Sequence, residues 1–195
     1  MDMMEQKLNW MEKYDEVQDV ARKTGKPILL FFHSHHCSGC KMMIEKTLPT
    51  RDVVLHAGHR FALGMFEISE PGNKDLVKKY NVEWTPTFII ADKDGSEAYR
   101  FVGYLPPKDF RAQLILGEGK VSMRNEDYDK AISCFETIDK KYPETEAAPE
   151  AAYYTGVAQY KKTNDAKMLK NAHIYLSRKY PESDWAKKAF AWSGL

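Results

Sequence analysis

The sequence has no excess of charge of either sign and no long hydrophobic run. It contains 29 basic and 28 acidic residues among 195, for a formal net charge of +1, so nothing favours nucleic acid or an anionic membrane as a partner. A helix that spans a membrane needs about 20 predominantly apolar residues, whereas the longest apolar run, residues 28–32, has the length of a buried strand. We therefore expect a soluble globular protein with no membrane span.

The N-terminus lacks the pattern of a secretory signal peptide, which is a basic segment followed by an apolar one. Residues 1–5 read MDMME. Two interpretations stay open. The protein is cytoplasmic as the sequence is written, or it is periplasmic or exported and an upstream signal has been removed.

Cysteine is scarce, with three residues in the chain, too few for a scaffold held by disulfides. Two of them form Cys37-Ser38-Gly39-Cys40, the spacing of a redox or metal motif. The motif follows an apolar strand and opens a helical pattern, and the free N–H groups and dipole at a helix start stabilise a thiolate. We therefore predict Cys37 as the attacking nucleophile and Cys40, one turn later, as the resolving thiol. We predict the third, Cys134, to be a small buried apolar side chain.

Apolar spacing and turn residues predict an alternating α/β order in the first part of the chain. The first strands need crossover connections and should pair in parallel, and the last two should pair in antiparallel fashion. The predicted helices cover residues 14–24, 40–47 and 73–80, with a further helix opening at Pro106-Pro107; the predicted strands cover residues 28–32, 61–68, 88–91 and 98–102.

Strand patterns are absent beyond about Gly117, and a repeat takes their place. Lys141-Tyr142-Pro143-Glu144 recurs as Lys179-Tyr180-Pro181-Glu182, 38 residues later, close to the period of helical-hairpin repeats. With Asp127–Ala131 and Ala151–Tyr160, this region resembles tetratricopeptide-type (TPR) repeats, which implies a protein partner on the repeat surface. We predict a domain over residues 1–116 and a TPR-like module of about two units over residues 117–195.

Three motifs in the first domain resemble the thioredoxin superfamily over roughly residues 8 to 116. They are Lys26-Pro27 with its apolar strand, Cys37-Ser38-Gly39-Cys40 with Lys41, and Thr85-Pro86-Thr87; Trp10 and Lys26-Pro27 point to the thioredoxin-related branch. The resemblance implies a three-layer α/β/α sandwich with a mixed sheet. It also implies a cis Thr85–Pro86 bond beside the cysteines, with Trp84, Thr85 and Pro86 contacting the substrate chain.

The sequence departs from thioredoxin at three places that affect the chemistry. The motif between the cysteines changes to Ser-Gly, the Trp before the first cysteine becomes His36, and the buried Asp of the central strand becomes Phe31. The last change removes the usual base for Cys40, and Glu67 on the next strand is a candidate substitute.

Positive charge near the first cysteine favours its thiolate and makes the disulfide more oxidising. His35, His36 and Lys41 lie close to Cys37 in the sequence. We therefore expect these side chains to raise the reduction potential above the roughly −270 mV of thioredoxin.

The leading hypothesis is a thiol–disulfide oxidoreductase that acts on protein thiols and disulfides, with no cofactor or metal beyond the redox disulfide. A second is a non-enzymatic interaction scaffold, which Phe31 motivates. A third is a metal-binding protein, because imidazole and thiolate groups bind zinc or copper. The cluster behind this third hypothesis is His33, His35, His36, Cys37 and Cys40.

Overall fold

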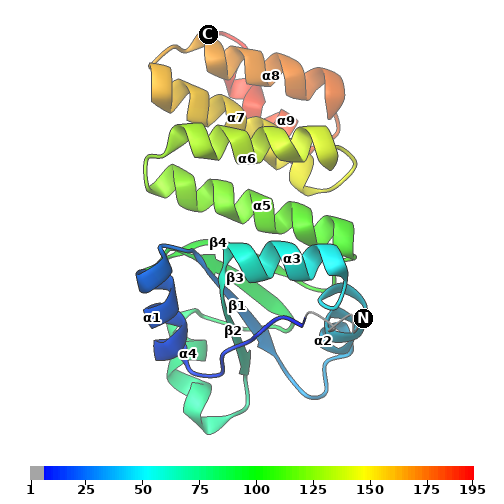
Figure 1. Cartoon of the computed structure of the whole chain (residues 1–195). Coiled ribbons are helices and arrows are strands. Elements are labelled where there is room, and N and C mark those ends of the chain that lie inside the picture. Colours follow the sequence, from blue (N-terminus) through cyan, green and yellow to red (C-terminus); the bar gives the residue numbers. More distant parts are fainter. Residues whose placement is uncertain (1–6) are drawn as a thin grey trace, which may run out of the picture. The chain divides into compact units, whose positions relative to one another are not determined.

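The computed structural model describes residues 7–195, which form two compact units (Figure 1). One unit ends at Arg111 and the other begins at Ala112. This division falls inside one continuous helix, α5 (Pro107–Arg124). The boundary predicted between residues 116 and 117 stays a prediction. Within the described residues, no helix is long and apolar enough to cross a membrane.

A four-stranded mixed sheet organises the first unit. Its strands are β1 (Ile28–His33), β2 (Ala62–Glu67), β3 (Thr87–Ala91) and β4 (Glu97–Val102), in the order β2-β1-β3-β4. β1 pairs with β2 in parallel and with β3 in antiparallel fashion, and β3 pairs with β4 in antiparallel fashion. These pairings confirm the mixed sheet and both predicted strand orientations. β1 reads as a continuous apolar run because it is central and covered on both faces.

Helices cover both faces of this sheet, as the three-layer prediction requires (Figure 1). Helices α1 (Tyr14–Thr24) and α4 (Lys74–Lys79) pack on the face formed by alternate residues of β1 such as Leu30. On the opposite face, the first turns of α5 bring the ring of Phe110 to 4.9 Å from that of Phe88. Large apolar side chains thus separate each helical layer from the sheet.

The helix α3 (Arg51–Arg60) has no counterpart in the sequence-based prediction. Its β-branched Val53 and Val54 and its Gly58 lower the intrinsic helix propensity of the segment. Burial of Val53, Val54 and Ala57 against the rest of the unit stabilises the helix instead. Tertiary packing therefore overrides a weak local preference.

The second unit is entirely helical. After α5 it contains α6 (Tyr128–Lys141), α7 (Ala147–Thr163), α8 (Lys167–Lys179), α9 (Asp184–Ala189) and a short 3-10 turn, η3 (Phe190–Trp192). Helix α7 packs against both α6 and α8. This arrangement confirms the predicted all-α, TPR-like module.

The sequence repeat corresponds to a repeated turn. The chain leaves α6 through Tyr142 and α8 through Tyr180, and each tyrosine donates its N–H to a helix carbonyl four residues earlier. The hydroxyl of Thr145 donates to the Tyr142 carbonyl at 2.7 Å, and that of Ser183 donates to the Tyr180 carbonyl at 2.8 Å. The two halves of the repeat therefore share one local structure.

Candidate active site

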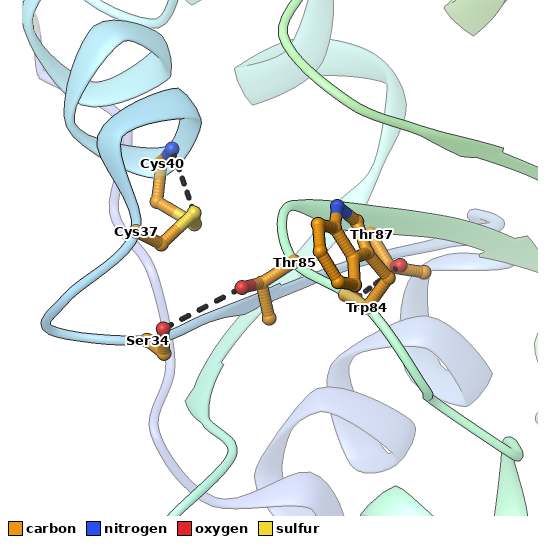
Figure 2. The surroundings of a disulfide bond; sticks show 6 residues. All are labelled: Ser34, Cys37, Cys40, Trp84, Thr85 and Thr87. Carbon is orange, nitrogen blue, oxygen red and sulfur yellow. Dashed lines mark hydrogen bonds between the residues drawn. A yellow bond between two sulfur atoms is a disulfide. The ribbon is translucent and has the colours of Figure 1, made fainter.

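The two cysteines of the motif form a disulfide at the end of β1 (Figure 2). Cys37 is the N-cap of α2 (Ser38–Met42), and Cys40 lies in the first turn of this helix, with 5.2 Å between the two Cα atoms. The backbone N–H of Cys40 donates to the Cys37 sulfur at 3.0 Å. The helix start thus directs an N–H group at the sulfur that would carry charge after reduction.

The two sulfur-bearing residues differ in accessibility. Cys37 is half-buried, whereas Cys40 is buried with 2% of its surface exposed. Helix α2 continues without interruption into a π-helical turn, η1 (Met43–Thr47), whose Met43 is fully buried. The helix is therefore anchored on its inner side, and Cys37 is the cysteine that a large molecule can reach.

A loop with a cis Thr85–Pro86 peptide bond faces the disulfide. Gly39 packs so closely on this loop that a Cβ at this position would lie 3.1 Å from Pro86 Cδ, so the glycine permits the approach. The hydroxyls of Ser34 and Thr85 are 3.5 Å apart and link the loop to the chain after β1 (Figure 2). Trp84 is 70% exposed beside them.

An aromatic cluster surrounds the position in β1 at which thioredoxin has a buried Asp. The Phe31 side chain is fully buried and stacks on Phe88, with 4.5 Å between ring centroids. Trp10 covers the same ring at 5.9 Å. Phe31 therefore contributes packing and no proton acceptor.

Glu67, the candidate substitute base, is the last residue of β2 and the register partner of His33. Its carboxylate accepts hydrogen bonds from the hydroxyl and the backbone N–H of Ser69 at 2.6 and 2.9 Å, and these bonds hold the pKa of Glu67 below its usual value. Burial lowers the pKa of His33. A carboxylate whose ionised form is stabilised by Ser69 is a weak proton acceptor. The role of Glu67 as the base for Cys40 stays a prediction.

The side chains predicted to tune the thiolate, His35, His36 and Lys41, are all exposed. The Lys41 ammonium lies 3.9 Å from the carboxylate of Glu45, one turn further along the helix. Their effect on Cys37 stays a prediction.

The predicted cluster of histidines and cysteines does not assemble as a set of metal ligands in the described part of the chain. The structure brings His35 together with Glu67 and Glu70, whose ligand atoms lie within 4.8 Å of one another. The two carboxylates were not identified as partners of His35 from the sequence, because strand pairing brings them together.

The second unit has a groove on α6, α7 and α8. Its volume is about 370 Å³, and it is lined among others by Asp139, Gly156 and Tyr175. A Cβ at Gly156 would clash with the Cβ of Ala172, so the glycine lets α7 and α8 approach closely. The sequence indicated a repeat surface but not the residues that line this groove.

Residues 14–117, more than half of the chain, match the family described as thioredoxin-like domain. The chain belongs to this thioredoxin-like family. The match covers the disulfide, the cis-proline loop and the whole mixed sheet, so family and fold agree.

Three relatives illustrate the likeness of the thioredoxin-like region. The thiol:disulfide interchange protein DsbD of Ralstonia nicotianae is 30% identical over 112 residues, 56% of this chain and 18% of that protein. A thioredoxin H-type of Fagopyrum esculentum is 28% identical over 94 residues, 48% of this chain and 72% of that protein. The solution structure of a Thermus thermophilus thioredoxin is 28% identical with a TM-score of 0.50, covering 55% of this chain and 84% of that one. The chain thus spans less than a fifth of the DsbD relative.

A second family, described as outer membrane lipoprotein, matches residues 109–193. This match covers the helical unit and supports its TPR-like character. It overlaps the thioredoxin-like match over residues 109–117, which all lie in α5.

Proposed function

We propose that the protein is a thiol–disulfide oxidoreductase that exchanges disulfides with protein substrates. The observation that carries the proposal is the Cys37–Cys40 disulfide at the start of α2, with one accessible and one buried cysteine and a cis-proline loop facing both. Family membership and relatives named thioredoxin and thiol:disulfide interchange protein point in the same direction.

Two thiol–disulfide exchanges complete the reaction. In the reduced protein, the Cys37 thiolate attacks one sulfur of a substrate disulfide, forms a mixed disulfide and releases the other substrate sulfur as a thiolate. Cys40, after losing its proton, attacks the Cys37 sulfur and releases the second substrate thiolate. Two electrons pass to the substrate, which takes up two protons, and the Cys37–Cys40 disulfide forms. The reverse sequence oxidises a substrate dithiol.

The loop at residues 84–86 is proposed to hold the substrate chain. Pro86 has no N–H, so the backbone of Thr85 offers its groups to an extended peptide without a competing donor from the next residue. The exposed indole of Trp84 supplies apolar contact area beside this backbone.

The side chains around the two sulfurs should affect the attack by Cys37 and the resolution by Cys40 differently. Phe31 supplies no base behind Cys40, so we expect resolution of the mixed disulfide to be slower than in thioredoxin. Lys41, His35 and His36 stand on the same loop and helix as Cys37. We expect the positive charge of Lys41, and that of His35 and His36 when they are protonated, to favour the Cys37 thiolate and to raise the reduction potential above about −270 mV.

The helical unit is proposed to bind a protein partner through the groove on α6, α7 and α8. The groove lies on the region that matches the outer membrane lipoprotein family. Because the description of that family names the outer membrane, we propose a periplasmic or exported location. The cytoplasmic interpretation has no support from these comparisons.

Reduction of insulin disulfides, with dithiothreitol as electron donor, tests the proposed activity. We expect the wild type to accelerate insulin precipitation and Cys37→Ser to lower the rate to that of dithiothreitol alone. Cys134→Ala is the matched control, since it removes the third thiol from the other unit and should retain full activity.

Trapping of the mixed disulfide distinguishes the attacking role of Cys37 from the resolving role of Cys40. With Cys40→Ser, a mixed disulfide between Cys37 and a substrate protein should accumulate, because the resolving thiol is gone. An inactive wild type with every donor tried, together with a Cys37→Ala variant that retains full biological function, would support the interaction scaffold in place of the enzyme.

A further inference from the structure

A histidine and two glutamates meet where β1 and β2 end. The parallel strands finish side by side, with His33 and Glu67 as register partners (Figure 1). The chain after β1 supplies His35, and the turn after β2 supplies Glu70. One ligand atom from each of His35, Glu67 and Glu70 lies within 4.8 Å of the other two.

The Glu67 carboxylate is the buried member of this group, with 8% of the residue exposed. Both hydrogen bonds from Ser69 go to Oε2. The other oxygen, Oε1, is buried and has no hydrogen-bond partner. An ionised carboxylate oxygen buried without a partner is unfavourable, and coordination of a cation is one of the few ways to satisfy it.

The turn that joins the two glutamates is held by its own backbone. The Glu67 carbonyl accepts from the Asn73 side-chain amide at 2.9 Å and from the Glu70 N–H at 3.4 Å. The Glu70 carbonyl accepts from the Asn73 N–H at 2.9 Å. The two carboxylates are therefore kept near each other before any ligand arrives.

We propose that His35, Glu67 and Glu70 bind a divalent transition-metal ion, for which Zn²⁺ is the representative probe. One imidazole nitrogen with two carboxylate oxygens is a ligand set that suits Zn²⁺ and its neighbours, and water would complete the coordination. Two ligands at about 2.1 Å from one ion are at most about 4.2 Å apart. The three ligand atoms lie within 4.8 Å of one another, and the side chains of His35 and Glu70 are exposed.

The charge of the group favours a cation. Two carboxylates gather there, and within residues 7–195 neither Glu67 nor Glu70 forms an ion pair with a lysine or arginine. The inference goes beyond the proposed redox chemistry and does not depend on it, because the ligands include neither sulfur.

Zn²⁺ titration of the full-length chain, purified without a His-tag and with its disulfide intact, tests this site. Calorimetry with a competing chelator should give one Zn²⁺ per chain. We expect Glu70→Gln and His35→Gln, both at exposed positions, to weaken binding at least tenfold. His36→Gln is the matched control for the neighbouring imidazole and Glu83→Gln for an exposed carboxylate, and both should bind as the wild type does.

A double variant, Cys37→Ser with Cys40→Ser, separates this site from a thiolate site. It should retain the wild-type Zn²⁺ affinity while losing insulin reduction, so the two proposals fail or succeed separately. Unchanged affinity in Glu70→Gln and His35→Gln would overturn the inference. Absence of saturable binding to the wild type, or binding that needs a reduced disulfide and disappears in the double variant, would overturn it as well.

Discussion

The two units differ in the side chains that predominate in their interiors, with large apolar chains in the first and many alanines in the second, although Phe135 of the second is also fully buried. In the first, Phe31 and Phe88 stack on the sheet and Phe110 of α5 packs on them. In the second, small residues such as Ala151 and Gly156 are buried where helices meet. A helix packed on a sheet leaves a layer that large rings fill, whereas closely approaching helices need small residues. The first unit should therefore be most sensitive to lost volume and the second to added volume.

Removing a ring from the first unit should give the largest loss of stability. Phe31→Ala deletes a fully buried side chain that contacts Trp10 and Phe88, and such changes cost about 3–5 kcal/mol. Hydrogen exchange followed peptide by peptide should show lost protection in β1 and β3. If the loss were below about 1 kcal/mol, or were confined to peptides after Ala112, the contrast between the units would not hold.

Adding volume to the second unit should have an intermediate effect. Gly156→Val places side-chain atoms against Ala172 and the Met168 carbonyl, and overpacking of this kind costs about 1–3 kcal/mol. Urea unfolding, together with hydrogen exchange of α7 and α8, measures it. Gly194→Val is the control, because no atom lies within 4 Å of a Cβ there; an equal effect of both variants would count against close helix packing as the cause.

A polar link between α6 and α8 should give the smallest effect and a pH dependence. Burial alone would raise the pKa of Asp139, but hydrogen bonds from Lys179 at 2.8 Å and Tyr175 at 2.6 Å outweigh it, and the pKa is lowered. A lowered pKa contributes stability above the unfolded-state value of about 3.9 that is lost as the pH falls through the folded-state value. Asp139→Asn should cost about 1 kcal/mol at neutral pH, because the pair is partly exposed.

Urea unfolding at several pH values checks this prediction. The difference between wild type and Asp139→Asn should shrink as the pH is lowered from about 5 to below 3.9. Asp129→Asn, whose carboxylate side chain is 76% exposed, should change stability by less than about 0.5 kcal/mol at any pH. A difference for Asp139→Asn that grows on acidification would show that burial, and not its hydrogen bonds, dominates.

Features that depend on local spacing were predictable from the sequence. The helix over residues 14–24 has the predicted bounds, because its apolar face and the following Gly25 define it. The cysteines of the motif form the disulfide, since one helical turn separates them. The recurring Lys-Tyr-Pro-Glu segment marks two turns with the same hydrogen bonds.

Features that depend on distant contacts were missed or remained open. Helix α3 is stabilised by burial of Val53, Val54 and Ala57 in spite of a poor helical sequence. The hydrophobic run of β1 placed Phe31 in the core, but its stacking on Phe88 depends on the antiparallel register of β1 and β3. Glu67 was a candidate base for Cys40 on the sequence alone. In the structure its neighbours are Ser69, His35 and Glu70.

By itself, the sequence determined the disulfide-forming cysteine pair, the thioredoxin-like order of elements and the helical repeat, because each depends on residues that are close along the chain. Tertiary structure alone decided which oxygen of Glu67 is left unpaired and that His35 meets two carboxylates. The reason is that parallel pairing of β1 with β2 brings the ends of two distant segments together, and no spacing within either segment encodes that meeting.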